Sequence, residues 1–500
     1  MMDISIKGNK LIMKAKPIIL QVALFAILSI LAGACSTSTS TTEPPTQISS
    51  VPMEESPTTE TDDAGPDEIQ KILDKPLSDE GPWWVFSTTN GFFAINPDGS
   101  GLTQFYHGPI NSPHIYRILT APRNGHIAYL TGNDLYNTTL RVNEFPGHTL
   151  IVEMPLTSDQ SEPGNDSMPG DPEVEAVRAM IHAPSMAFSP DGRYLAFMGA
   201  IEGPTSDLYL FSLENYETTR LTEGPSQAYQ PVWSPDGKYI VHTGVNTFGT
   251  GAGYSMTGIW AAQADDSGVL TLYDPSGSGP EEIIGWVDDQ TFVVHSWDPV
   301  CGPNNLRTFN IETKESNEVW SESFRSVAFD PSNAVAVLSS NVEECSPEGG
   351  GGIYLVPTDG RAPRRILEDT GPQVMWSPGA NLFLASTEYG ILAIDSNGQF
   401  INLDSPPGAD PFPAVAPVSK DLAWSGNSLW IGPLLGSIDH PPQEIFNEPV
   451  YTVAWDQNGQ SVIFFADSGL YVAQQPDYTP LLVDEGLDNR NGYSGWVSLD

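Results

Sequence analysis

Basic residues and cysteines are scarce in this sequence. It holds 21 Lys and Arg against 63 Asp and Glu, a formal net charge of −42 at pH 7, and only three cysteines. A field of that sign repels phosphate backbones, so nucleic acid is not expected as a partner. It would attract cationic ligands or basic proteins, although an acidic surface also serves solubility alone.

Recognisable catalytic motifs are absent as well. The eight histidines include no His-Glu-x-x-His pattern, and no Gly-x-Ser-x-Gly occurs. The acidic segments 395–399 and 456–460 lack a full set of calcium ligands and match ordinary hairpin turns. We therefore predict no catalytic residue, no metal and no cofactor, and a non-enzymatic role is favoured over an enzymatic one.

The first 34 residues differ from the rest of the chain. Lysines at positions 7, 10, 14 and 16 precede an apolar run from Ile18 to Ile30, broken by Gln21 and Ser29, which is the layout of an export signal. The sequence Leu31-Ala-Gly-Ala-Cys35 then resembles the end of a bacterial lipoprotein signal peptide, with Leu31 four residues before the cysteine instead of the usual three. The resemblance implies a lipid on Cys35. Plain secretion and an uncleaved membrane anchor are the alternatives, and all three place the remaining chain outside the cytoplasm.

Residues 35–80 are rich in Ser, Thr, Pro and acid, with few large apolar side chains. Such a segment cannot bury enough apolar surface to offset its ordering entropy. We expect a disordered tether that holds residues 81–500 away from a membrane to which the lipid binds. The expected location is therefore the bacterial cell envelope, on its extracytoplasmic side.

A unit recurs along residues 81–500. Its clearest copies are Met186-Ala-Phe-Ser-Pro-Asp-Gly-Arg-Tyr-Leu-Ala-Phe-Met198 and Val232-Trp-Ser-Pro-Asp-Gly-Lys-Tyr-Ile-Val-His242. Each indicates a strand, a tight turn and a second strand, because Pro presets φ for the turn and Gly accepts a positive φ. Two further alternating segments follow each copy, so the unit has four strands.

Weaker copies of the unit begin at Ile284, Val327, Val374 and Val453, and degenerate ones span Ile118–Tyr129 and Ala414–Trp424. Eight such units in series predict an all-β fold, a β-propeller of four-stranded antiparallel blades. The aromatic-Ser-Pro-Asp-Gly turn resembles the TolB-type, WD-like propeller repeat over roughly residues 82–500. The resemblance implies the fold, and the partners of TolB itself are not carried over.

The two ends of the repeat region complement each other. Segments 83–86, 92–95 and 102–105 indicate the last three strands of a blade, and Tyr493–Asp500 resembles a first strand without its blade. Their pairing would close the ring and hide both sheet edges. The prediction is nine blades, or eight if one degenerate unit forms none.

Long insertions gather on one predicted face of the propeller. Connections between second and third strands share a face, and those at 133–147, 245–257, 298–305 and 341–351 are long. Such loops are often functional. Tyr136, Phe248 and Tyr254 are therefore candidate ligand contacts, with simple loop variation as the alternative.

The two cysteines other than Cys35 fall in equivalent insertions of adjacent units. Cys301 and Cys345 would project from the same face, and an oxidising compartment favours a bridge between them. We predict a Cys301–Cys345 disulfide, with a metal pair or two free thiols as alternatives.

Aromatic residues recur at the first-strand position of the units. They are expected to pack in the core between neighbouring sheets: Phe188, Trp233, Trp286, Phe329, Trp376 and Trp455. Residues 158–175, with acids among Gly and Pro, are expected to form a solvated insertion.

These features favour an extracytoplasmic, membrane-anchored binding or scaffolding module for a protein, peptide or glycan. The alternative is an extracytoplasmic hydrolase or lyase with its site in the propeller channel.

Overall fold

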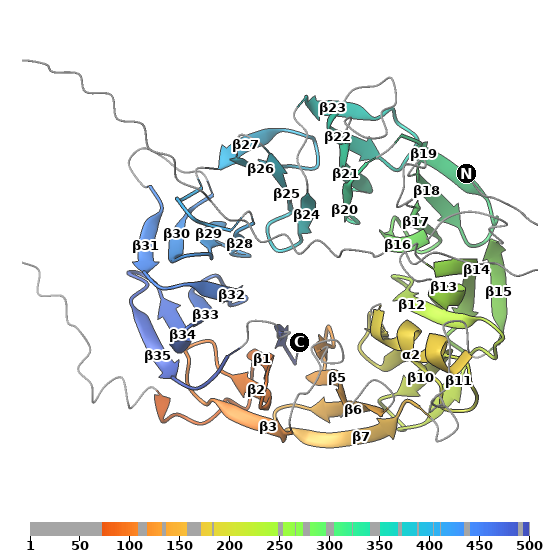
Figure 1. Ribbon diagram of the computed structural model, residues 1–500, viewed down its shortest axis with the longest axis horizontal. Coiled ribbons are helices and arrows are strands. Elements are labelled where there is room, and N and C mark those ends of the chain that lie inside the picture. Colours follow the sequence, from red (N-terminus) through yellow and green to blue (C-terminus); the bar gives the residue numbers. More distant parts are fainter. Residues whose placement is uncertain are drawn as a thin grey trace, which may run out of the picture. The chain divides into compact units, whose positions relative to one another are not determined.

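In a computed structural model of the chain, the described residues form nine four-stranded antiparallel sheets, arranged as the blades of a β-propeller ring (Figure 1). The all-β propeller is confirmed, and of the two predicted blade numbers nine is the correct one. The structure describes residues 73–108, 118–132, 137–157, 172–182, 185–248, 254–265, 267–273, 281–296, 305–322, 324–340, 351–368, 373–387, 390–403, 405–410, 412–434, 441–488 and 494–499.

In blades 2 to 9 the four strands follow one another along the chain. Blade 2 holds β4 (Ile118–Thr120), β5 (His126–Gly132), β6 (Thr138–Glu144) and β7 (Thr149–Pro155), and blade 3 holds β8 (Met186–Phe188), β9 (Tyr194–Gly199), β10 (Asp207–Ser212) and β11 (Thr218–Arg220). Blade 4 holds β12 (Gln227–Trp233), β13 (Tyr239–Phe248), β14 (Tyr254–Gln263) and β15 (Val269–Tyr273), and blade 5 holds β16 (Glu281–Trp286), β17 (Thr291–Ser296), β18 (Asn305–Asn310) and β19 (Ser316–Trp320).

The remaining blades repeat this order. Blade 6 holds β20 (Ser326–Asp330), β21 (Val335–Ser340), β22 (Gly352–Pro357) and β23 (Arg364–Leu367), and blade 7 holds β24 (Val374–Ser377), β25 (Leu382–Thr387), β26 (Gly390–Ile394) and β27 (Phe400–Leu403). Blade 8 holds β28 (Ala414–Val415), β29 (Asp421–Trp424), β30 (Leu429–Pro433) and β31 (Gln443–Phe446), and blade 9 holds β32 (Val450–Trp455), β33 (Ser461–Ala466), β34 (Gly469–Gln474) and β35 (Pro480–Asp484).

Blade 1 joins the two ends of the propeller, as predicted. It contains β1 (Trp83–Thr88), β2 (Gly91–Ile95), β3 (Thr103–His107) and the last strand, β36 (Ser494–Val497). β36 pairs antiparallel with β1, with Trp84 opposite Trp496, and Figure 1 shows the dark-blue end of the chain beside the orange β1. This pairing covers the sheet edge that β1 would otherwise leave open.

The Ser-Pro-Asp-Gly turns hold the first two strands of a blade together. In blade 4 the Ser234 amide donates to the Tyr239 carbonyl over 2.9 Å, and the Ser234 hydroxyl donates to the Asp236 carboxylate over 2.8 Å. Gly237 has a φ of 71°, a left-handed value that a side chain would strain. Short-range chemistry therefore fixes each hairpin, which explains why the repeat is legible in the sequence.

The first-strand aromatics pack in the core, as expected. Trp233, Trp286, Phe329 and Trp455 are 5–7% exposed, and Phe188 and Trp376 are partly buried. Apolar clusters contain residues of neighbouring blades, such as Phe197 of blade 3 with Trp233 of blade 4. The core of the propeller thus lies between the blades.

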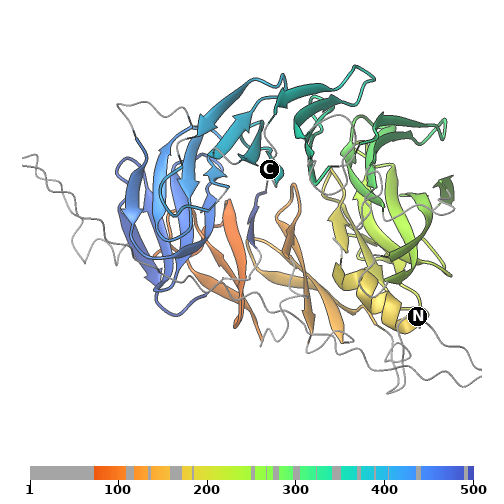
Figure 2. The same cartoon turned by 45° about the horizontal axis from the view of Figure 1, so that its top comes forward.

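The insertion expected at residues 158–175 is in part wrong. Residues 158–171 lie outside the described part, but Pro172–His182 form helix α2, with Pro172 at a position that suits a helix start. Ala176, Val177 and Ala179 are at most 2% exposed, and α2 contacts β9, β12 and β13. Figure 2 shows this helix (yellow) against the neighbouring strands. The apolar face of α2 packs on blades 3 and 4. This tertiary packing stabilises the helix, although the sequence just before it is rich in polar residues.

Candidate functional site

A cavity of about 350 Å³ lies where blade 3 meets blade 4. The connection from β11 to β12 forms one wall, through residues 221–226. Blade 4 supplies the other side chains around it: Gln227, Ala228, His242, Gly244, Trp260 and Val269. Connections between blades lie on the same face as those between second and third strands, so the cavity opens on the face predicted to bind ligand.

The blade 4 side of the pocket is built by strand register. His242 on β13 is directly opposite Trp260 on β14, so their side chains lie on one face of the sheet. The two rings stack, with centroids 5.9 Å apart and planes 18° apart. Gly244 follows on the same face, and a Cβ there would lie 2.1 Å from Cζ3 of Trp260. Because Gly244 has no side chain, there is room for the indole of Trp260 beside β13.

His242 brings an unsatisfied polar atom to this wall. Its side chain is 4% exposed, and Nδ1 lies 3.3 Å from the main-chain oxygen of Thr243. Because a carbonyl only accepts, this contact places the ring hydrogen on Nδ1 and leaves Nε2 as an acceptor. Within the described part of the chain, Nε2 has no hydrogen-bond partner.

Burial also keeps this histidine uncharged. Desolvation lowers the pKa of His242 to about 4, against the smaller opposing effects of the Thr243 carbonyl and the Asp207 carboxylate. At neutral pH the ring is therefore neutral and presents a lone pair on Nε2. A ligand that donates a hydrogen bond would satisfy it.

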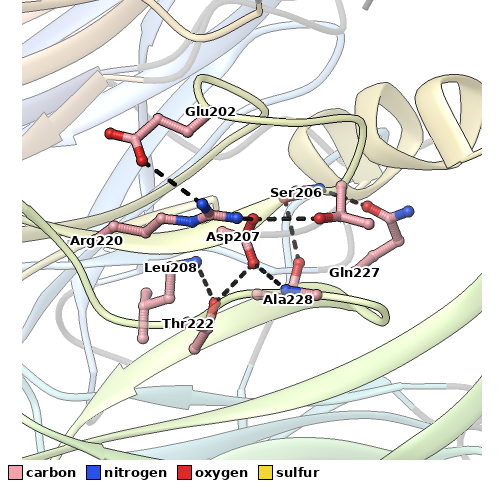
Figure 3. Close-up of polar contacts among 10 residues, drawn as sticks. Glu202, Ser206, Asp207, Leu208, Arg220, Thr222, Gln227 and Ala228 are labelled. Carbon is pink, nitrogen blue, oxygen red and sulfur yellow. Dashed lines mark hydrogen bonds and ion pairs between the residues drawn. The ribbon is translucent and has the colours of Figure 1, made fainter.

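The opposite wall is held by a buried carboxylate, Asp207 on β10 (Figure 3). Asp207 is 1% exposed and accepts from Nη2 of Arg220 over 2.7 Å. It also accepts from the Thr222 hydroxyl over 3.1 Å and from the Gly224 amide over 3.0 Å. These bonds tie the start of the connection to blade 3, so the pocket wall is fixed before any ligand arrives.

A second set of bonds links the two blades below the pocket. The Ser206 amide donates to Oε1 of Gln227 over 2.6 Å, and Ser206 Oγ lies 3.5 Å from the carbonyl of Ala228 (Figure 3). Ser206 precedes β10 and Gln227 begins β12. The blades that form the pocket are therefore joined by direct hydrogen bonds.

The charges around the pocket are mainly negative. Glu223 is exposed at the connection, and Glu202 lies 3.5 Å from Nη1 of Arg220. Arg220 thus contacts two carboxylates, Asp207 and Glu202. Two carboxylates therefore contact one guanidinium, and the exposed Glu223 adds a further negative charge, so this end of the pocket favours positive charge.

The predicted site residues stand in different positions relative to this pocket. Cys35, Tyr136, Cys301 and Cys345 lie outside the described residues. Phe248 and Tyr254 were expected on a loop, but they are the last residue of β13 and the first of β14, and they pair with each other. They extend the same hairpin that carries His242 and Trp260, and their role in binding stays a prediction.

The insertion predicted at residues 133–147 is also shorter than expected, because β6 occupies Thr138–Glu144. Sequence reasoning missed His242, Trp260 and Glu223 as site residues. The available signal was a histidine among the apolar residues of a second strand, Tyr239-Ile-Val-His242. A histidine at such a position is buried, and burial of a polar ring needs an explanation.

Two absences concern the described residues of the chain. They contain no group of three or more His, Cys, Asp or Glu placed to hold a metal ion. They also contain no helix with the length and hydropathy needed to cross a membrane.

No family model matches the chain. A stretch of 56 residues is 46% identical to a Bacillus subtilis (strain 168) protein named as the uncharacterized peptidase YuxL, and it covers 11% of this chain and 8% of that protein. The crystal structure of a eukaryotic initiation factor has a TM-score of 0.53 at 11% identity, covering 83% of this chain and 98% of that chain. TolB from Acinetobacter baumannii has a TM-score of 0.29 at 16% identity, covering 59% of this chain and 66% of that one. The likeness to the initiation factor is one of fold alone.

Proposed function

We propose that this chain is a non-enzymatic binding module that holds a protein, peptide or glycan in the pocket between blades 3 and 4. The observation that carries the proposal is His242, a buried neutral ring whose Nε2 lacks a partner in the described part of the chain, beside the partly exposed Trp260. A buried acceptor without a partner costs free energy, and a bound ligand would recover it. An aromatic platform beside one placed polar atom is typical of ligand sites.

The rigidity of the pocket supports the same function. Strand register positions His242 and Trp260, and the Asp207 network fixes the facing connection. Binding then needs little ordering of the protein, which saves part of the entropy cost of association. The β13–β14 hairpin continues along the chain from His242 and Trp260 to the paired residues Phe248 and Tyr254.

The test uses the full chain as bait against a bacterial envelope extract, in parallel with two glycine variants. Gly244→Ala places a Cβ against Trp260 and should displace the indole, whereas Gly486→Ala meets only an ordinary contact with Asp484. The expected result is a bound species that Gly244→Ala loses and Gly486→Ala keeps, with both variants folded by circular dichroism. Equal capture of the species by the two variants would refute the pocket between blades 3 and 4 as the binding site.

We further propose that the module is tethered to a bacterial membrane by a lipid on Cys35, outside the cytoplasm. The support is the sequence arrangement of lysines, apolar run and Ala-Gly-Ala-Cys35. The experiment is intact mass and membrane partitioning of the chain expressed in a bacterial host. A diacylglyceryl mass with membrane retention, both lost in Cys35→Ala, is expected; a soluble, unmodified product would refute the anchor.

A peptidase activity is the second candidate function. The observation that favours it is the 46% identity over 56 residues to a protein named as a peptidase, although the match covers only 8% of that protein. The two functions differ in turnover. Mass spectrometry of a peptide mixture incubated with the full chain would reveal new cleavage products if the chain is a peptidase and an unchanged mixture if it only binds.

A further inference from the structure

The polar groups that the pocket offers to a ligand share one character. His242 lines the pocket and has a buried acceptor, Nε2, without a partner in the described part of the chain, and Glu223 is an exposed carboxylate on the facing connection. Trp260 adds the negative face of an indole ring. The nearby guanidinium of Arg220 already contacts Asp207 and Glu202. The pocket therefore favours a ligand group with hydrogen-bond donors and positive charge.

The size of the pocket limits the ligand group. Ligand pockets typically range from roughly 300 to 1,000 Å³, and a volume of about 350 Å³ is at the lower end. Such a volume suits one long side chain better than a multi-ring ligand. The stacked rings of His242 and Trp260 are planar, with 18° between their planes. A planar cation matches this geometry better than a compact ammonium, because it can stack on an aromatic face while its donors reach acceptors at its edge.

The charge of the whole chain acts in the same direction. With 63 acidic and 21 basic residues, the long-range field attracts cationic partners and raises their rate of encounter. A neutral saccharide would gain nothing from this field, although it could stack on Trp260. Charge complementarity therefore favours a basic peptide over a glycan as the occupant.

Building on the proposed function, we propose that the pocket between blades 3 and 4 takes the arginine side chain of a basic peptide. The guanidinium stacks on Trp260, donates to Nε2 of His242 and pairs with the carboxylate of Glu223. The β13–β14 hairpin lies beside the emerging peptide backbone and carries Phe248 and Tyr254 at its end.

The experiment measures binding of two peptides to the full chain by calorimetry at low salt. One is acetyl-Gly-Gly-Arg-Gly-Gly-amide, and the other has citrulline, the neutral isostere, in place of arginine. We expect the arginine peptide to bind roughly tenfold more tightly, because citrulline loses both the charge and the cation–π attraction. Added salt should weaken only the arginine peptide.

Three variants locate the binding. Glu223→Gln should weaken binding of the arginine peptide by about fivefold, because an exposed ion pair is lost. Glu485→Gln removes one negative charge from an exposed position next to blade 9 and should leave the affinity unchanged. His242→Phe keeps a ring of similar size without the acceptor and should also weaken binding. If His242→Phe does not fold, Glu223→Gln still tests the arginine site, because Glu223 is exposed and its substitution should leave the fold intact.

The outcomes separate this inference from the proposed function. Equal affinities of the arginine and citrulline peptides, both abolished by Gly244→Ala, would refute the arginine ligand and leave a binding pocket. Equal weakening by Glu223→Gln and Glu485→Gln would show attraction to the surface in general and would also refute the inference. If no peptide binds and the envelope extract yields no species sensitive to Gly244→Ala, both proposals fail.

Discussion

Trp233 in the first strand of blade 4 donates its indole N–H to the main-chain carbonyl of Ala187 in the first strand of blade 3, over 2.9 Å. Trp455 of blade 9 makes the equivalent bond to Ala414 of blade 8 over 3.1 Å. Both tryptophans occupy the same position in the repeat, at the end of the first strand of the blade. Blades 3 and 4, and blades 8 and 9, are thus joined at their first strands by a polar bond as well as by apolar packing.

The contribution of this bond can be measured by comparing two tryptophans. Trp233→Phe removes the donor and part of the ring, so the free energy of unfolding should fall. Trp286→Phe makes the same change at the equivalent position of blade 5, where the indole nitrogen has no partner among the described residues. We expect Trp233→Phe to cost about 1 kcal/mol more than Trp286→Phe in urea unfolding. Equal losses would mean that the bond adds nothing to stability.

The Asp207 network predicts a larger effect on stability. Asp207→Asn removes the charge that faces Arg220, whose side chain is 20% exposed. The guanidinium would then face a neutral amide in place of Asp207 and keep the longer charged contact, at 3.5 Å, with the exposed Glu202. We expect a loss of about 2–3 kcal/mol in the free energy of unfolding, because a largely buried charge loses its partner.

Arg361→Gln is the matched control for that measurement. Its pair with Asp359 is exposed on both sides, and such pairs contribute little. No measurable change is expected in the same urea titration. If Asp207→Asn is as mild as Arg361→Gln, the network does not hold blade 3 to the pocket wall.

Much of the fold could be predicted from the sequence because its determinants are local. The Ser234-Pro-Asp-Gly237 turn closes on itself through the Ser234 and Asp236 side chains, so each hairpin is encoded within a few residues. The pairing of the terminal strands could be predicted because the beginning of the repeat region had three strands of a blade and its end had one. Even the degenerate unit at Ala414–Trp424 forms a blade, although β28 has only two residues.

The pocket and helix α2 depend on relationships that a sequence does not display. His242 and Trp260 are 18 residues apart, and they meet only because β13 and β14 pair in one register, with irregularities near Val245. The apolar face of α2 is buried only by packing against blades 3 and 4, so the sequence of the helix alone does not indicate it. The residues that line the pocket could therefore not be predicted from the sequence, and the binding role of the face with the long insertions stays a prediction.

The two cysteines predicted to form a disulfide lie outside the described residues, so the bridge is tested chemically. The full chain, exported in a bacterial host and treated with iodoacetamide without reductant, should show no alkylation at Cys301 or Cys345. Prior reduction should expose both thiols and lower thermal stability, because a loop of about 45 residues would no longer be closed. Alkylation of either cysteine without reductant would contradict the disulfide.

Two buried histidines predict how stability depends on pH. Burial lowers the pKa of His242 and of His295 to about 4, from an ordinary value of 6.5. In the unfolded chain each ring takes up a proton as the pH falls through about 6.5, whereas in the folded chain it does so only near 4. The unfolded state therefore binds more protons between these values. Stability is complete above about pH 6.5 and is lost as the pH falls toward 4, by about 1.4 kcal/mol per pH unit for each histidine.

The double variant His242→Phe, His295→Phe isolates this effect. Both changes keep an apolar ring and remove the titrating group, so every other acid and base is common to parent and variant. Urea unfolding at pH 7 and pH 5 should show that the parent loses roughly 2–4 kcal/mol more than the variant over this interval. Single variants should each recover part of that difference, since the two rings lie on blades 4 and 5 and should act independently. Parallel pH profiles for parent and double variant would mean that neither ring is held neutral by burial, and the lone pair that His242 is proposed to offer a ligand would then be in doubt as well.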